Sequence, residues 1–136
     1  EGEDYWRKWD NLKPYVKYIK EEPKHYDNSN ACINFDKTVS DTLDRLKELL
    51  IIKGKEYRRN NNVYHNFDEG AKITGLIPER ILDGFLLKHE ISIKDMVDDI
   101  DLGILPTEDK VNEKFDDNII YLLLKKAMIL ERIKNK

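Results

Sequence analysis

Two pairs of acidic residues offer the chemistry that this sequence suggests most directly. Asp95 and Asp98 stand three residues apart near the end of one expected helix, and Glu113 and Asp116 stand three apart at the start of the next. Residues at i and i+3 share a helix face, so two antiparallel helices joined by a tight turn would bring all four carboxylates together. Because these carboxylates repel one another unless a cation binds, we predict a site for Mg²⁺ or Mn²⁺, which also hold phosphate oxygens.

A simpler interpretation of these acids stays open. The chain has 27 acidic residues among 136, so pairs with this spacing arise by chance. In that case they are solvated helix faces or partners of helix dipoles, and no metal is involved.

A run of basic residues followed by asparagines is the second candidate. Arg58 and Arg59 end an expected helix, and the three asparagines that follow at 60–62 favour a turn. Guanidinium groups suit phosphate geometry, and an aromatic ring can stack on a base. We therefore predict a nucleotide contact made by Arg58, Arg59, Tyr64, His65, Asn66 and, from a later helix, Lys88. The alternative is an exposed helix end whose cations only complement the dipole.

Several other kinds of protein find no support. The sequence contains no glycine-rich phosphate loop, no HExxH spacing and no GxSxG elbow, and its single cysteine and three histidines make a closed zinc site difficult to assemble. A net charge of -3 makes nucleic acid an improbable partner. The single cysteine also fits a reducing, cytoplasmic setting, and the longest apolar runs are too short to span a membrane, which predicts a soluble protein.

The elements that must position these residues are expected to be helices. With 6 glycines and 4 prolines there are too few turn residues for a β-sandwich, so we predict an all-α fold, a compact bundle of four to five helices. The expected helices cover residues 36–57, bent or ended early at Gly54, then 67–73, closed by Gly75, a segment opened by Pro78, a segment capped by Ser92, and 107–134.

The expected buried sides of the two longest helices follow from the spacing of their apolar residues. For the helix 36–57 they are Val39, Leu43, Leu46, Leu50 and Tyr57. For the helix 107–134 they are Val111, Phe115, Ile119, Leu122, Ile129 and Ile133.

The first 35 residues form a separate segment in this interpretation. It contains six of the 13 aromatic residues, Tyr5, Trp6, Trp9, Tyr15, Tyr18 and Tyr26, and a short helix is expected over 13–21. We divide the chain into an aromatic N-terminal helical segment, 1–35, and a bundle domain, 36–136. The segment is expected either to pack on the bundle or to contact a partner.

The segment 113–123 resembles the signature helix of the all-α nucleotide pyrophosphohydrolases of the MazG type. In that family an ExxD pair precedes an apolar run that often contains a tyrosine, which corresponds here to Tyr121. An earlier helix of the family carries ExxE, and its four acids hold Mg²⁺ on a nucleoside triphosphate while water cuts between the α and β phosphates. Here aspartate replaces glutamate at 95 and 98, and alignment on Asp117 and Tyr121 places Lys114 at the first acidic position.

Under the hypothesis of a pyrophosphohydrolase of this kind, particular residues of this chain take defined roles. The metal ligands would be Asp95, Asp98, Glu113 and Asp116; the catalytic residues would be Glu56, Asp98 and Glu113; and Tyr121 would contact the substrate. The region 43–130 also resembles small phage-encoded helical proteins associated with nucleotide modification, through Tyr57, the pair Asn66 and Phe67, and a late Asp-rich helix.

Three functions follow as hypotheses. The first is a Mg²⁺-dependent nucleoside triphosphate pyrophosphohydrolase. The second is a non-catalytic, phage-type inhibitor in the host cytoplasm that binds a nucleotide signal or a host defence protein, and the departures from the family pattern favour it slightly. The third is an interaction module that uses the aromatic N-terminal segment. A homo-oligomer is possible in each case.

Overall fold

The computed structural model describes residues 26–136 and contains four helices and no strand in this range. They are α2 (Ala31–Tyr57), α3 (His65–Thr74), α4 (Pro78–Asp101) and α5 (Glu108–Lys134). The expected helix over 13–21 and the aromatic residues before Tyr26 lie outside this range. The all-α prediction is confirmed.

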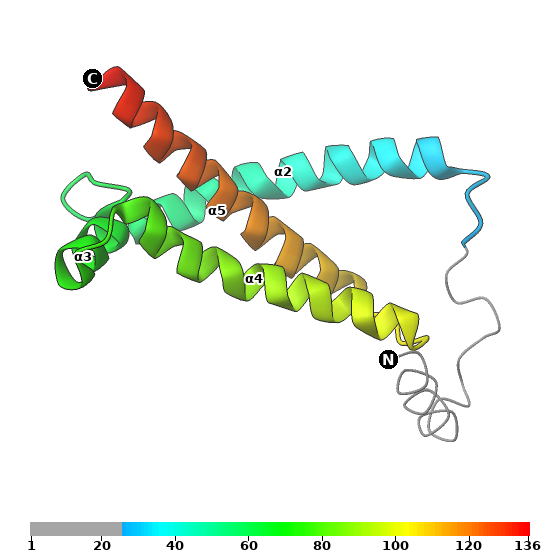
Figure 1. Cartoon of the computed structure of the whole chain (residues 1–136). Helices are drawn as coiled ribbons and strands as arrows, with labels where there is room; N and C mark the ends of the chain where they lie inside the picture. The colour runs from blue at the N-terminus through cyan, green and yellow to red at the C-terminus, as the bar shows by residue number, and fades with distance from the viewer. Residues whose placement is uncertain (1–25) are drawn as a thin grey trace, which may run out of the picture.

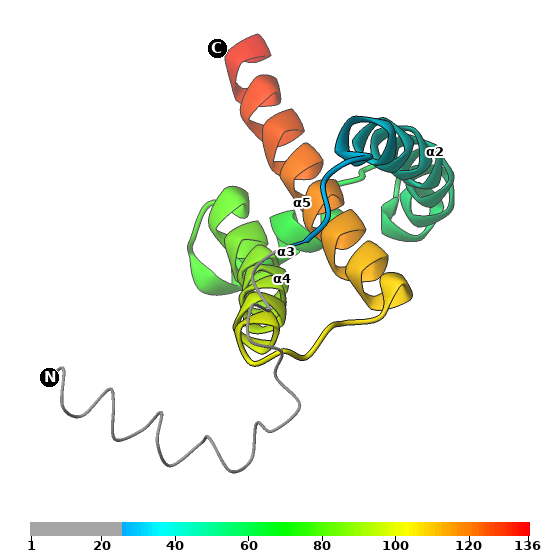
Figure 2. The same cartoon turned by 90° about the vertical axis from the view of Figure 1, so that its right-hand side faces the viewer.

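The helices form a bundle with α5 at its centre. Helix α5 packs along α4 on one side and contacts α2 on the other, while α3 packs against the start of α4. Figure 2 shows α5 between α2 and α4, and Figure 1 shows that the first half of α2 extends away from the other helices. Among the described elements α5 is therefore the one through which α2 and α4 are joined.

Short-range signals set several helix ends as expected. Helix α3 stops at Gly75, which adopts the left-handed conformation with φ of 76°. Pro78 opens α4, and the Thr107 side chain caps α5 by accepting a hydrogen bond from the Lys110 amide. These are local effects of residue type, which explains why the sequence predicts them well.

Other boundaries differ from the expectations. Helix α2 begins at Ala31, so the predicted domain boundary between residues 35 and 36 lies within it, and it continues through Gly54 to Tyr57. Ser92 does not start a new helix. Its hydroxyl donates to the Lys88 carbonyl one turn earlier, and α4 runs without a break from Pro78 to Asp101.

The hydrophobic core is small and draws on all four helices. Its buried members are Leu46, Phe67, Leu82, Leu86, Ile120, Leu124 and Met128. Partly buried residues such as Leu49, Val63 and Ile81 pack around it. A core of this size leaves many large apolar side chains at the surface.

The predicted buried sides of α2 and α5 are largely wrong. In α5 the buried residues are Asp116, Ile120, Leu124 and Met128, whereas Phe115, Leu122 and Ile129 remain 43%, 48% and 46% exposed. Leu122 lies two residues after Ile120 and hence about 200° around the helix. Helix α5 has apolar residues on two opposite sides. The side that is buried against the other helices is not the one that we predicted from the spacing of the apolar residues.

Only part of the predicted stripe of α2 is covered. Leu46 is buried, but Val39, Leu43 and Leu50 are 40%, 53% and 40% exposed. None of the helices in the described part of the chain is long and apolar enough to cross a membrane.

Candidate functional site

Asp116, one of the four expected metal ligands, forms an ion pair with Arg45. Asp116 is buried, and its carboxylate accepts hydrogen bonds from Arg45 of α2, with Nε 2.8 Å from Oδ2. The same guanidinium also reaches Asn112 at 3.1 Å. The bond to Asp116 raises the pKa of Arg45 above its ordinary value. Asp116 therefore joins α2 to α5.

The other three predicted ligands are exposed and separate. Asp98 lies 2.7 Å from Lys94 with its side chain 56% exposed, the Glu113 side chain is 64% exposed, and Asp95 is exposed. Within residues 26–136 no group of three or more His, Cys, Asp or Glu side chains could hold a metal ion. The structure does not bring the four carboxylates together, and Asp95 and Asp98 lie on the side of α4 away from its buried residues.

The basic loop is a tight turn as expected. Asn60 and Asn61 have φ of 52° and 62°, and Arg59 and Asn62 exchange two backbone hydrogen bonds. Positive φ at both central residues defines a turn that asparagine tolerates well. Arg58 and Arg59 are exposed, so they are accessible to an anion, and the asparagines are explained by the turn itself.

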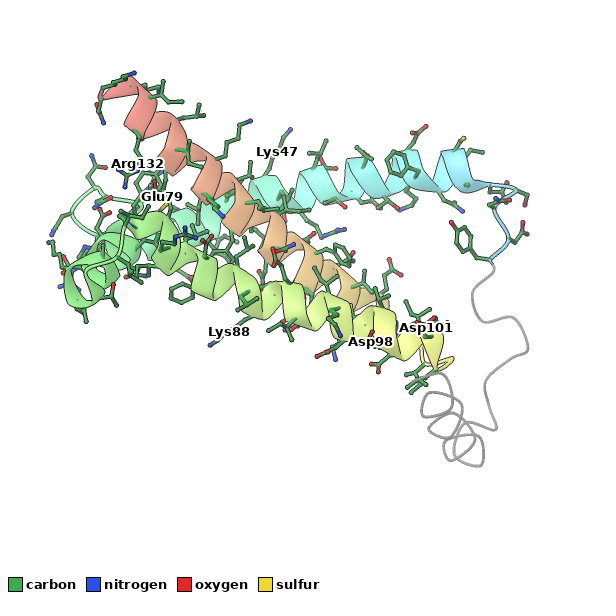
Figure 3. The ribbon with its side chains drawn as sticks, viewed as in Figure 1. Lys47, Glu79, Lys88, Asp98, Asp101 and Arg132 are labelled. Atoms are coloured by element: carbon green, nitrogen blue, oxygen red, sulfur yellow. The ribbon has the colours of Figure 1, made fainter. Side chains whose placement is uncertain are left out.

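The remaining predicted contact residues do not form one site. Tyr64 and His65 are partly buried, whereas Glu56, Asn66 and Lys88 are exposed. The Lys88 side chain points away from α2 and α5 (Figure 3). Of the predicted substrate-binding residues, Tyr121 alone lies in the aromatic cluster described next.

Four aromatic side chains from three helices, Tyr121 among them, are linked by successive ring contacts. The Tyr121 ring lies nearly parallel to that of Phe85, at 13° with 6.1 Å between centroids, and 5.1 Å from that of His89 at 30°. Phe67 of α3 meets Phe85 edge-on at 5.7 Å. We call Phe67, Phe85, His89 and Tyr121 the aromatic cluster. Phe67 is buried in the core and Phe85 is 43% exposed, so the cluster runs from the interior to the surface.

Two ion pairs stand one turn on either side of Tyr121 along α5. Lys53 of α2 donates to Asp117 at 2.8 Å, and Lys125 of α5 donates to Asp83 of α4 at 2.6 Å. Because Asp117, Tyr121 and Lys125 follow at four-residue steps, they share one face of the helix. The bond to Lys125 lowers the pKa of Asp83 below its ordinary value. The two lysine side chains are 28% and 32% exposed, so water reaches both.

Asn118 adds a polar atom beside this face. Its Oδ1 is buried and has no hydrogen-bond partner among the described residues. An acceptor in this state calls for a donor from a ligand or from water. Asn118 precedes Tyr121 by three residues, which places it on a neighbouring side of the same turn.

Several residues of this site are not among those predicted from sequence. Phe85, His89 and Asp117 come from two helices and from positions up to 32 residues apart. Short-range spacing gives a partial signal, since Phe85 and His89, like Asp117 and Tyr121, are four residues apart. Sequence alone does not indicate that these two pairs face each other.

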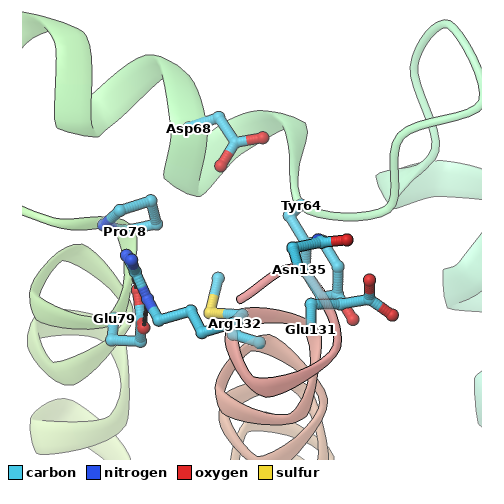
Figure 4. A pocket seen from close by; sticks show the side chains of 8 residues that line it. Tyr64, Asp68, Pro78, Glu79, Glu131, Arg132 and Asn135 are labelled. Atoms are coloured by element: carbon cyan, nitrogen blue, oxygen red, sulfur yellow. Dashed lines mark hydrogen bonds and ion pairs between the residues drawn. The ribbon is translucent and has the colours of Figure 1, made fainter.

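A hollow lies at the end of the bundle that contains the C-terminus. It has a volume of about 290 Å³ and is lined by Tyr64, Asp68, Pro78, Glu79, Met128, Glu131, Arg132 and Asn135 (Figure 4). On one side of it Arg132 donates to buried Glu79, and this bond lowers the pKa of Glu79. Burial raises the pKa of Tyr64. Each carboxylate of the lining already has a partner, since Glu79 pairs with Arg132, Glu131 lies near Lys134 and Asp68 accepts from Asn62, so the hollow ranks behind the aromatic cluster as a candidate site.

Comparison of the chain with protein-family models, curated proteins and solved structures gives no match. The proposal that follows therefore rests on the arrangement of the side chains.

Proposed function

We propose that this protein binds a nucleotide at the aromatic cluster, without the predicted carboxylate metal site. The observation that carries the proposal is the stacking of the Tyr121 ring of α5 on the rings of Phe85 and His89 of α4. Aromatic side chains give a nucleobase a stacking surface worth about 1–3 kcal/mol per base. Phe85 keeps enough exposed area for such a contact.

The surrounding charges fit a phosphate-bearing ligand. Lys53 reaches α5 one turn before Tyr121, through Asp117, and Lys125 stands one turn after it. Lys125 is partly exposed, and an ammonium has three donors, so it can bind a phosphate oxygen in addition to the Asp83 carboxylate.

The same arrangement favours binding over hydrolysis. Asp116 is committed to Arg45, and Asp95, Asp98 and Glu113 stand apart from it, so no set of acids among the described residues is gathered to activate water. A Mg²⁺ ion would arrive with the phosphates of the nucleotide, as part of the ligand. This supports the non-catalytic nucleotide binder over the pyrophosphohydrolase among the functions expected from sequence.

The test compares two phenylalanines of equal exposure. Phe85 belongs to the aromatic cluster and Phe115 lies on the far side of α5, and both are 43% exposed. Calorimetric titration with a panel of nucleoside mono-, di- and triphosphates in the presence of Mg²⁺ should reveal one that binds. For that nucleotide, Phe85→Leu should weaken binding by roughly 5- to 100-fold, the loss of one stacking contact, while Phe115→Leu should leave the affinity unchanged.

Two further measurements make the test decisive. Tyr121→Leu should weaken binding as Phe85→Leu does, with helical content checked by circular dichroism in each variant. Binding that is unaffected by both substitutions, or no binding at millimolar concentrations of any nucleotide, would overturn the proposal. Release of pyrophosphate by the unmodified protein would restore the enzyme hypothesis.

A further inference from the structure

The first half of α2 carries an apolar face that nothing in residues 26–136 covers. Every residue from 31 to 40 is exposed. Phe35, Val39 and Leu43 follow at four-residue steps and so share one side of the helix, where they are 66%, 40% and 53% exposed. We call these three residues the α2 face. Leu46, three residues after Leu43, continues this side and is buried in the core, so the face extends the buried line of α2 beyond its neighbours.

This half of α2 is also acidic. Residues 31–44 contain three aspartates and one lysine, a net charge of -2. Asp36 borders the α2 face, because it lies three residues before Val39. A segment that covers the face would therefore be apolar on one side and carry positive charge beside it.

The chain itself supplies such a segment immediately before α2. Leu12, Val16 and Ile19 follow at steps of four and three, the spacing of one helix face, and Trp9 precedes them. Lys13, Lys17, Lys20 and Lys24 follow at steps of four, three and four. Residues 12–24 hold these four lysines and two glutamates, a net charge of +2 that complements the -2 of α2.

A short stretch that contains a turn connects this segment to α2. Ser29 donates its amide and its hydroxyl to Asp27, at 3.0 and 2.8 Å, and the Ala31 amide donates to the Asn28 carbonyl at 3.0 Å. In both views the chain at Asp27–Asn30 bends from the axis of α2 toward the side on which α4 lies (Figures 1 and 2). The link between residue 24 and the first residue of α2, Ala31, is therefore short.

From these observations we propose that residues 9–24 bind the α2 face of the same molecule. The tether of a few residues gives the segment an effective concentration in the millimolar range, so a modest contact area is sufficient. Burial of Phe35, Val39 and Leu43 against Trp9, Leu12, Val16 and Ile19 removes apolar surface from water on both sides. A second copy of the chain is the competing occupant, and it differs in that its binding depends on protein concentration.

The position of the tryptophans makes this proposal directly testable. The two tryptophans of the chain are Trp9, at the start of this segment, and Trp6, three residues before it, so intrinsic tryptophan fluorescence reports on this end of the chain. In the full chain the emission should be blue-shifted and less accessible to acrylamide than in the same chain unfolded in urea. Val39→Asp should shift the emission to the red and raise the acrylamide quenching constant toward the unfolded value.

A matched control and a second variant separate docking from unfolding. Ile73→Asp changes an 85% exposed apolar residue at the end of α3 and should leave the tryptophan signal unchanged. Asp36→Lys places a like charge beside the lysines and should also shift the emission to the red, without loss of helical circular dichroism. Quenching in the unmodified chain equal to that in urea, or a signal that Val39→Asp and Asp36→Lys both leave unchanged, would overturn the proposal. So would a blue shift that disappears on dilution together with a halving of the sedimentation mass, because that result identifies a second copy as the occupant.

Discussion

Arg45 and Asp116 form the most buried ionic link between α2 and α5. The guanidinium Nε lies 2.8 Å from Asp116 Oδ2, and the two side chains are 33% and 5% exposed. Arg45 also donates to Thr42 and Asn112, each at 3.1 Å. This pair engages Asp116, one of the predicted metal ligands. It also connects α2, whose first half extends away from the other helices, to the core.

Removal of the Arg45 side chain should therefore destabilise the protein. Arg45→Ala leaves the buried Asp116 carboxylate without its guanidinium, and we expect a loss of about 1–3 kcal/mol in the free energy of unfolding. Asp98→Ala removes a carboxylate that pairs with Lys94 on the surface and should cost no more than about 0.5 kcal/mol. Urea denaturation at neutral pH measures both. Equal effects for the two variants would show that the Arg45–Asp116 pair contributes little.

Sequence reasoning succeeds for features that depend on nearby residues. Gly75 ends α3 because it adopts a positive φ at low cost, and Thr107 starts α5 because its hydroxyl accepts an amide bond three residues on. Neither feature needs knowledge of the rest of the chain. The same holds for the turn at Asn60 and Asn61.

Sequence reasoning fails where contacts among several helices determine which side of a helix is buried. Helix α5 presents Phe115 and Leu122 on one side and Ile120 and Leu124 on the other, and either set satisfies a helical period. The choice depends on contacts with α2 and α4, including an ion pair between residues 71 positions apart. The aromatic cluster has the same origin, since Phe85 and Tyr121 meet only after α4 and α5 pack.

The two sides of α5 should respond differently to truncation. Leu124 is 9% exposed within the core, and Leu124→Ala should lower the free energy of unfolding by about 2–5 kcal/mol through lost burial and the cavity that remains. Leu122 is 48% exposed, and Leu122→Ala should cost less than about 1 kcal/mol. The two midpoints of urea denaturation give the comparison. A large loss for Leu122→Ala would mean that this side of α5 is covered in solution.

Substitution by alanine should have opposite effects on stability at three glycines within helices, destabilising at Gly70 and stabilising at Gly54 and Gly84. A Cβ at Gly70 would lie 2.8 Å from Cγ2 of Ile81, where α3 packs on α4, so Gly70→Ala should destabilise by about 1–3 kcal/mol despite its higher helix propensity. At Gly54 and Gly84 an added methyl group would meet nothing within 4 Å, and alanine at either should stabilise by about 0.5–1 kcal/mol. Thermal denaturation ranks the three variants. A stabilising Gly70→Ala would show that α3 can move away from Ile81 at little cost.

The Glu79–Arg132 pair should make stability depend on pH in the acidic range. The hydrogen bond from Arg132 lowers the folded-state pKa of buried Glu79 below its ordinary value of 4.5. The pair therefore stabilises the fold fully above about pH 4.5, and this stabilisation is lost as the pH falls from there through the lowered pKa.

Glu79→Gln should reduce the free energy of unfolding by about 1–3 kcal/mol at pH 7, because Arg132 then loses a charged acceptor. The difference from the unmodified protein should shrink steadily as urea denaturation is repeated between about pH 5 and pH 3. Glu131→Gln changes an exposed carboxylate in the same hollow and provides the control. A Glu79→Gln deficit of the same size at every pH would show that packing of the side chain, and not its charge, stabilises this end of the bundle.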